Sequence, residues 1–365
     1  MPADSTELEE FGAFPAEDSL REGPGQASIE PLDEETIADA LVRMGAIGTS
    51  ERPRCQPLAG DGVSSELWII DVPGRRLCLK RALPVLRVPQ HWEAPTTRNH
   101  HEFAWFRAAS RILPDAVPRL VGQDSGHGMF VMEYLDPRMF PVWKHQLRDG
   151  RADPAVAAAV AARLAQIHNR TAGDPEIART FATDAIFYSL RIEPYLIAPT
   201  RLHAELAGVL GSLAHATART RLALVHGDVS PKNILIGRRG PVFLDAECAW
   251  YGDPAFDLAF VLNHLLLKCL WNVSAASRFL ACFGRLAETY LDLVAWEPRE
   301  DVEARSAHLL PALLLARVDG KSPVEYITTP RDRDRVRRVA RTLLLNPVDR
   351  LHAIREAWSA ELGRP

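Results

Sequence analysis

Lysine is scarce in this chain of 365 residues, which carries five lysines against 38 arginines. Each lysine is therefore an uncommon choice, and its position is informative. The formal net charge is only -4, so the overall charge gives no reason to expect a polyanionic partner. The segment RDRDRVRRVAR at 331–341 has six arginines. It favours a solvated helix face, with a nucleic-acid patch as the alternative.

The chain also lacks a run of 18 apolar residues, which argues against a transmembrane helix. Its N-terminus has no basic stretch followed by an apolar one, which argues against a secretory signal. The five cysteines form no C-x-x-C pair. An odd, scattered set of this kind predicts reduced core thiols and a cytoplasmic location.

The first 30 residues carry eight acidic side chains and one basic side chain, together with several prolines and glycines. A segment of this composition cannot bury enough apolar surface to order itself, so residues 1–30 are expected to form a disordered acidic tail. The next segment suggests a helix that begins after Asp33, because Ile37, Leu41 and Met44 repeat at helical spacing.

Short apolar and β-branched runs between 54 and 83 predict strands, and Pro73-Gly74 between two of them predicts a hairpin. A helix near 99–113 and two more strand candidates complete a small N-terminal lobe over 31–135. Beyond it the pattern is mostly helical. The predicted fold class is therefore α+β, with a small β-sheet lobe and a larger, mainly helical lobe over 136–365.

The strongest chemical signal is the segment HGDVSPKN at 226–233. Phosphoryl transfer from ATP needs a carboxylate that accepts the proton of the attacking hydroxyl, and Asp228 suits this catalytic role. Asn233 can turn its amide oxygen toward a metal ion. His226 is expected to order the loop through hydrogen bonds rather than to act as a base.

A second motif, FLDAE at 243–247, follows the first. Mg²⁺ prefers hard oxygen ligands, and Asp245 and Glu247 lie two residues apart after an apolar strand, so both carboxylates can face one side. Taken singly, these acids are ordinary turn and strand-end residues. The two motifs together favour a kinase that uses ATP and Mg²⁺, with Asn233, Asp245 and Glu247 as metal ligands.

The nucleotide site is predicted upstream of these motifs. Gly60, Gly62 and Ser64 lie in a turn between strands, where small residues let backbone N–H groups approach phosphate. Lys80 lies on the next strand, where protein kinases keep the lysine that binds the α- and β-phosphates. Glu102 on the following helix is the expected ion-pair partner of Lys80.

The segment VMEYL at 131–135 resembles the hinge that offers backbone groups to adenine, so Glu133 and Leu135 complete the predicted cofactor-binding set. The alternative, an ordinary buried strand, is compatible with this role.

The strings HGDVSPKNIL (226–235) and DAECAWYGDPAFDLA (245–259) resemble the signature of the aminoglycoside phosphotransferase and choline kinase superfamily. This resemblance implies a protein-kinase-like, two-lobed fold, and it assigns Asp257 the role of bracing the catalytic loop. Protein kinases usually carry lysine two residues after the catalytic aspartate. Ser230 stands there in this chain, which favours a small-molecule substrate.

Within the superfamily, the chain is most similar to methylthioribose kinases, which share the D-x-E motif and a glycine-poor loop like GDGVSSELW. The resemblance implies a small, sugar-like acceptor. Methylthioribose kinases carry two adjacent arginines late in the chain, whereas Arg317 has no arginine neighbour. Arg317 is a tentative substrate residue, and a salt bridge with Asp319 or Glu325 is the alternative. Trp250 is also a tentative substrate residue, with core packing as the alternative.

Two other functions remain open at this stage. An aminoglycoside kinase would share the motifs, but it would be expected to gather carboxylates around a polycationic substrate. A nucleotide-binding pseudokinase would be expected to lack part of the catalytic set. The expected partner is a small-molecule substrate, without nucleic acid or membrane, and a homodimer is an assembly that the sequence allows.

Overall fold

The computed structural model describes residues 32–58, 64–87 and 92–364. The predicted acidic tail at 1–30 and the two loop glycines, Gly60 and Gly62, lie outside these residues.

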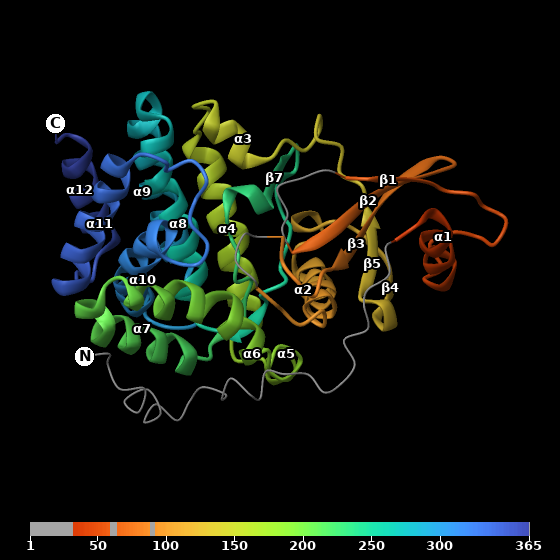
Figure 1. Cartoon of the computed structure of the whole chain (residues 1–365), viewed down its shortest axis with the longest axis horizontal. Helices are drawn as coiled ribbons and strands as arrows, with labels where there is room; N and C mark the ends of the chain where they lie inside the picture. The colour runs from red at the N-terminus through yellow and green to blue at the C-terminus, as the bar shows by residue number, and fades with distance from the viewer. Residues whose placement is uncertain (1–31, 59–63, 88–91, 365) are drawn as a thin grey trace.

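The N-terminal part is built on one five-stranded antiparallel sheet with the strand order β1-β2-β3-β5-β4 (Figure 1). The predicted hairpin is confirmed, because Val72 pairs with Arg75 across the turn and Gly74 adopts a φ of 75° that favours glycine. The strands are β1 (Arg54–Pro57), β2 (Ser65–Val72), β3 (Arg75–Ala82), β4 (Leu120–Asp124) and β5 (Met129–Glu133).

A helix covers each face of this sheet. The helix α1 (Glu34–Arg43) begins after Asp33, whose carboxylate accepts a hydrogen bond from the N–H of Thr36 at 2.8 Å. Its Ile37 and Leu41 pack with the side chains of one sheet face. The helix α2 (Arg98–Ile112) packs on the other face. Because strand side chains alternate between faces, Lys80 shares the α2 face with Cys78.

The remainder of the chain is mostly helical, so the predicted α+β class is confirmed. Its helices are α3 (Trp143–Arg148), α4 (Pro154–Thr171), α5 (Pro175–Thr180), α6 (Asp184–Phe187), the π-helix η5 (Tyr188–Ile197), α7 (Ala207–Arg219), α8 (Pro254–Trp271), α9 (Ala276–Leu293), α10 (Arg299–Asp319), α11 (Pro330–Leu345) and α12 (Leu351–Leu362). Short 3₁₀ turns are η3 (Pro114–Ala116), η4 (Ser125–His127), η6 (Ala198–Arg201), η7 (Ala204–Leu206), η8 (Pro231–Asn233) and η9 (Val273–Ala275). Two small antiparallel sheets of two strands each pair β6 (Ala223–Val225) with β9 (Trp250–Gly252) and β7 (Ile234–Gly237) with β8 (Gly240–Phe243).

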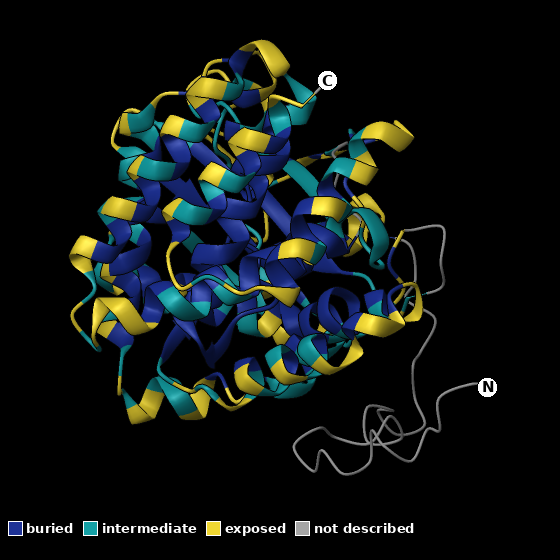
Figure 2. Cartoon of the chain, turned by 90° about the vertical axis from the view of Figure 1, so that its left-hand side faces the viewer, coloured by how far each residue is buried: buried dark blue, intermediate teal, exposed yellow. Residues whose placement is uncertain are grey.

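The helix α8 forms the centre of the helical part, where buried segments lie inside a shell of exposed ones (Figure 2). It packs against α9 and α10. By length and composition alone it could cross a membrane, but 94% of it lies inside the protein, as expected for a core helix. All five cysteines are buried and free of disulfides.

Candidate active site

Asp257, in the first turn of α8, braces the predicted catalytic loop from beneath. Its carboxylate accepts hydrogen bonds from the backbone N–H of His226 at 2.7 Å and of Gly227 at 2.8 Å. It also contacts Nε2 of His168 at 3.3 Å, and Nδ1 of His168 lies 2.7 Å from the hydroxyl of Tyr290. These groups are buried, so the network holds the loop in one conformation. The predicted bracing role of Asp257 is confirmed.

Gly227 is required by the close approach of two segments. Its φ is +79°, and a Cβ atom there would lie 2.5 Å from the backbone oxygen of Cys248. Any side chain would therefore both strain the backbone and push the catalytic loop away from the segment that follows the D-x-E motif.

His226 joins the two motifs. Its Nδ1 accepts the N–H of Asp228 at 3.1 Å, so the hydrogen lies on Nε2, which donates to the backbone oxygen of Leu244 at 3.1 Å. Burial lowers the pKa of His226, which keeps the ring neutral. The prediction that His226 orders the loop is confirmed.

Asp228 is buried beside two cations. The Nη2 atom of Arg191 lies 3.1 Å from its Oδ2, and the Nζ atom of Lys232 lies 3.6 Å from the same oxygen. Burial raises the pKa of Asp228, but Lys232 and Arg191 outweigh it, and the net shift is downward. The carboxylate is therefore ionised, and within the described ranges Oδ1 has no partner that competes with an incoming hydroxyl.

Arg191 is a site residue that sequence reasoning missed. It lies in the π-helix η5, and its guanidinium also donates to the backbone oxygens of Gly227 and Leu190. The side chain of Asp228 is thus oriented by a residue that is itself fixed by the loop backbone. π-Helices are rare and often occur at functional sites, but no motif in the sequence indicates one here.

We expect Arg191 to act as a positioning residue for Asp228. Arg191→Lys keeps a positive charge but loses the planar fork, so kcat should fall by about ten- to hundredfold, as expected for a charged hydrogen bond. Arg191→Met should additionally raise the pKa of Asp228 and move the acidic limb of the pH–kcat profile to higher pH. An unchanged pH profile in a folded Arg191→Met variant would show that Arg191 has only a structural role.

Asn233 and Asp245 lie on adjoining segments, because the backbone N–H of Leu244 donates to the backbone oxygen of Asn233 at 2.9 Å. The Nδ2 group of Asn233 donates to the backbone oxygen of Asp228 at 3.1 Å, which leaves the amide oxygen available for a cation. Asp245 has a φ of +66°, a strained conformation for a residue other than glycine, and such strain is typical of functional sites. Burial raises the pKa of Asp245, but Lys80 and Lys232 lower it overall.

Lys80 links the sheet to the catalytic motifs through its contact with Asp245, which was not predicted. Its Nζ lies 2.7 Å from Oε2 of Glu102 and is also paired with Oδ1 of Asp245. Burial lowers the pKa of Lys80, but Asp245 and Glu102 raise it overall, so the ammonium remains charged. The predicted Lys80–Glu102 pair is confirmed.

Replacing Lys80 with alanine should raise the KM for ATP and lower kcat/KM, because the phosphates lose a positive charge. The fold should be retained, since Glu102 can be protonated once its partner is gone: burial already raises its pKa. ATP kinetics combined with circular dichroism test this, and wild-type kcat/KM for ATP in the variant would contradict it.

Glu247 is held by a buried arginine. Oε2 of Glu247 lies 3.0 Å from Nε of Arg98, whose side chain is fully buried at the start of α2. The remaining donors of Arg98 bind the backbone oxygens of Ser64, Leu83, Ala94 and Pro95 at 2.6–2.9 Å. Arg98 was not predicted. It ties the D-x-E motif to Ser64, a residue of the predicted phosphate-binding turn.

Asp245 and Glu247 are expected to contribute unequally to Mg²⁺ binding. Asp245→Ala should raise the Mg²⁺ concentration needed for half-maximal activity more than Glu247→Ala does, because the Glu247 side chain is less accessible, at 9% exposed against 23% for Asp245, and is held by the fully buried Arg98. Titrating activity against Mg²⁺ measures both. If Glu247→Ala leaves the Mg²⁺ requirement unchanged, Glu247 is not a metal ligand and acts only through its ion pair with Arg98.

The predicted adenine-binding residues occupy the end of β5. The N–H groups of Glu133 and Tyr134 donate to the backbone oxygens of Arg119 and Arg76. Among the residues that the structure covers, the N–H of Leu135 has no partner, so it is available to a ligand. Glu133 and Leu135 also line a cavity of about 330 Å³, but neither Lys80 nor Asp245 lines it, and we do not assign it to the nucleotide.

The two tentative substrate residues have different environments. Arg317 donates to the hydroxyl of Tyr195 at 2.8 Å and to Ser322. The alternative of a salt bridge is wrong, because Asp319 pairs with His203 and Arg337, and Glu325 pairs with Lys144.

Trp250 is a core residue, so its tentative substrate role is corrected. Its ring is 1% exposed and stacks on Phe187 at 4.3 Å, and its Nε1 donates to Asp184 at 3.0 Å. The ring and the Nε1 atom of Trp250 are therefore both engaged in contacts within the protein.

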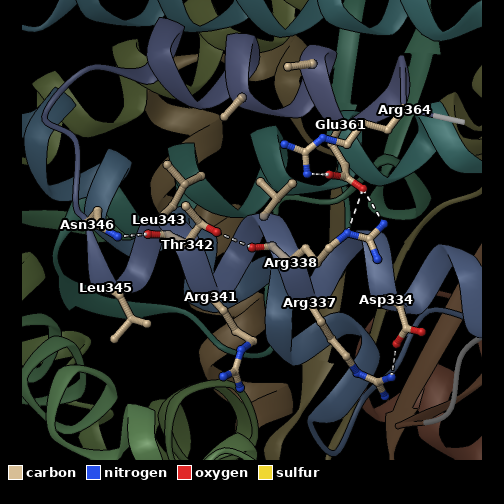
Figure 3. A pocket seen from close by; sticks show the side chains of 13 residues that line it. Asp334, Arg337, Arg338, Arg341, Thr342, Leu343, Leu345, Asn346, Glu361 and Arg364 are labelled. Carbon is tan, nitrogen blue, oxygen red and sulfur yellow. Dashed lines mark hydrogen bonds and ion pairs between the residues drawn. The ribbon is translucent and has the colours of Figure 1, made fainter.

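The arginine-rich segment forms one wall of a cavity of about 650 Å³ between α11 and α12 (Figure 3). Three arginines that line this cavity are paired with acids: Arg337 with Asp334 at 2.8 Å, and both Arg338 and Arg364 with Glu361. This pairing fits the solvated helix face predicted for the segment rather than a patch for nucleic acid.

Comparison with known proteins identifies related chains. A family model described as the phosphotransferase enzyme family matches residues 54–268, more than half of the chain. A methylthioribose kinase of Yersinia pseudotuberculosis is 25% identical over 269 residues, which cover 64% of this chain and 64% of the relative. Methylthioribose kinase 2 of Oryza sativa is 22% identical over 277 residues, covering 66% and 64%. The chain thus spans less than two thirds of the length of these relatives.

Among solved structures, the amicoumacin kinase hAmiN in complex with AMP-PNP, Ca²⁺ and Ami superposes with a TM-score of 0.53 at 15% identity. The superposition covers 88% of this chain and 96% of that one. This likeness confirms the predicted kinase-like fold, and the sequence matches confirm the resemblance predicted from the motifs.

Proposed function

Because the chain belongs to the phosphotransferase enzyme family, we propose that it transfers the γ-phosphoryl group of ATP to a hydroxyl group of a small molecule. One observation carries this proposal: Lys80 bridges Glu102 and Asp245, while His226 ties Asp228 to Leu244, the residue before Asp245. The nucleotide-side and acceptor-side groups therefore form one site.

The residues present fit a magnesium ion. Asp245 offers a carboxylate and Asn233 an amide oxygen, and both are hard donors of the kind that Mg²⁺ prefers. When bound, Mg²⁺ would neutralise charge on the β- and γ-phosphates. Lys80 is placed to bind phosphate oxygens, and Glu102 keeps its ammonium directed into the site.

Asp228 would orient the acceptor hydroxyl and accept its proton as the oxygen bonds to phosphorus. Arg191 and Lys232 hold Oδ2, so Oδ1 is the atom that faces the hydroxyl. A carboxylate with a lowered pKa is a weak base, which suits a reaction in which positioning contributes more than proton abstraction.

The preferred acceptor is a small, sugar-like molecule, and the similarity to methylthioribose kinases supports it. A polycationic aminoglycoside is disfavoured, because Arg191 and Lys232 surround the catalytic carboxylate with positive charge. A pseudokinase is disfavoured by the complete set of Lys80, Asp228 and Asp245.

A coupled assay of ADP release over pentoses, thiopentoses, amino alcohols and aminoglycosides tests the proposal. We expect turnover with a sugar-like acceptor and none with Asp228→Asn. If aminoglycosides react with kcat/KM above about 10⁴ M⁻¹s⁻¹, the lower end of ordinary enzyme efficiency, and sugars are inert, the sugar-like assignment is wrong.

A further inference from the structure

A second group of cationic side chains lies on the helical side of Asp228. It consists of Lys144 on α3, His264 and Lys268 on α8, and Arg317 on α10, and we call it the cationic cluster. Two of the five lysines of this lysine-poor chain belong to it. Their placement is therefore a specific feature of the site rather than a consequence of composition.

Lys268 is the most unusual member. It is only 1% exposed, and its Nζ lies 4.0 Å from the ring centroid of Trp271 and 3.9 Å from that of Tyr326. The two rings stack on each other at 4.5 Å. No carboxylate pairs with Lys268 in the described part of the chain, and the two ring faces are its nearest partners there.

The groups that face Lys268 are mostly cationic. Within the described residues, Glu325 is the one acid that acts on Lys268, and the carboxylate of Glu325 is already paired with Lys144 at 2.7 Å. Arg317 binds a tyrosine hydroxyl and Ser322 rather than an acid. Burial lowers the pKa of Lys268 to about 6, and it lowers the pKa of His264 as well, with Arg317 and Lys268 acting in the same direction. The surroundings therefore oppose protonation of Lys268 and His264, and a bound anion would favour the protonated forms of both.

Buried polar atoms without partners occur in the same region. Asn263 on α8 is fully buried, and neither atom of its amide group has a hydrogen-bond partner among the residues that the structure describes. The same is true of the hydroxyl of Tyr326 and of Nε of Arg317. Such groups are costly to leave unpaired, and a polar ligand bound at the cluster would satisfy those of Tyr326 and Arg317.

A single layer of side chains connects the cluster to the catalytic carboxylate. Arg191, which pairs with Asp228, lies over the rings of Tyr195 and Phe260 at 5.8 and 5.6 Å. Arg317 lies over the same tyrosine ring at 5.7 Å, and His264 contacts the phenylalanine ring at 5.3 Å. Asp228 and the cluster therefore lie on either side of one layer of side chains, and an acceptor that contacts both must pass beside this layer.

We propose that the cationic cluster binds an anionic group of the acceptor, either a carboxylate or a phosphate, while the acceptor hydroxyl lies at Asp228. This inference rests on the proposed function and narrows its substrate class from sugar-like to anionic. The rings of Trp271 and Tyr326 are partly exposed, and the anion would displace the Tyr326 ring from Lys268. Arginine and lysine together suit both anions. The guanidinium of arginine binds an anion through a planar fork of N–H donors, and the ammonium of lysine binds it as a point charge.

Matched acceptors test the inference. Each neutral pentose is compared with its aldonate, which supplies the carboxylate, and with its 5-phosphate, which supplies the phosphate. We expect one anionic series to have a kcat/KM at least about tenfold higher than its neutral parents, which is the effect of roughly one charged hydrogen bond. The difference should come chiefly from a lower KM. Neutral acceptors that equal or exceed both anionic series would overturn the inference and leave the proposed kinase activity intact.

Lys268→Met should remove this preference by raising the KM of the anionic acceptor. Lys321→Met is the matched control, because Lys321 pairs with Glu193 at 2.6 Å and lies outside the cluster. It should keep the preference. A Lys268→Met variant that is folded and keeps the full preference would contradict the inference.

Binding of sulfate, measured by calorimetry at constant ionic strength, tests the cluster without turnover. Sulfate stays fully ionised near neutral pH, so any pH dependence belongs to the protein. Lys268 is charged below its pKa of about 6, so affinity should fall as the pH rises above that value, and less so in Lys268→Met. Sulfate binding without ADP release from any acceptor would uphold the cluster and reject the proposed function. Absence of sulfate binding would reject the cluster.

Discussion

Asp228→Asn is expected to lower kcat by about 10²–10⁴-fold, the range for loss of a positioned general base, with ATP affinity retained. The amide keeps the size of the side chain but cannot accept the hydroxyl proton. Arg191 and Lys232 bind the side chain of Asp228 and not the groups assigned to the nucleotide. The substitution therefore separates acceptor activation from ATP binding.

Steady-state kinetics on the best acceptor and calorimetric titration with ATP provide the two measurements. Thermal unfolding of both proteins controls for misfolding, because Asp228 is only 6% exposed and its neighbours are charged. Near wild-type kcat in Asp228→Asn would remove Asp228 from the catalytic role.

Arg98→Met is expected to lower the free energy of unfolding by roughly 3–5 kcal/mol, the cost of leaving one partner of a buried ion pair alone. Arg98 is fully buried, and besides Glu247 it binds four backbone oxygens from three segments. Methionine fills a similar volume but satisfies none of these acceptors. Activity with ATP should also fall, because Arg98 no longer connects Ser64 to the D-x-E motif.

Urea unfolding of matched variants measures this effect. Arg43→Met is the control, since Arg43 is half-exposed and its pair with Asp124 should contribute no more than about 1 kcal/mol. The double variant Arg98→Met/Glu247→Gln should recover part of the loss, because the carboxylate is no longer left unpaired. An Arg98→Met variant as stable as the Arg43→Met control would contradict the structural role of Arg98.

The core of the site could be predicted because its residues lie in short motifs. Asp228 and Asn233 are five positions apart, and Lys80 was informative because the chain has so few lysines. Arg98 and Arg191 could not be found in this way. Arg98 meets its acid 149 positions away, and Arg191 meets the catalytic loop 36 positions away. With 38 arginines in the chain, neither one is conspicuous.

The fold shows the same division between local and distant information. The Asp33 cap and the Pro73-Gly74 hairpin depend on neighbouring residues, and both were predicted. The π-helix η5 has no such pattern, and it contains Pro194 in its interior. The pairing of β6 with β9 joins strands far apart in the sequence. The lobe boundary at residue 135, the cytoplasmic location and the homodimer remain predictions.

The most direct measurement is transfer of labelled phosphate from ATP labelled at the γ-position. The protein is incubated with Mg²⁺ and the acceptor panel, the label is followed in the acceptor and in inorganic phosphate, and the amount of ADP formed is measured in parallel. We expect the label to appear on one acceptor in equal amount to the ADP formed, with negligible transfer by Asp228→Asn. Label found only in inorganic phosphate, or equal transfer by wild type and Asp228→Asn, would contradict a kinase that uses Asp228 to phosphorylate a small-molecule hydroxyl.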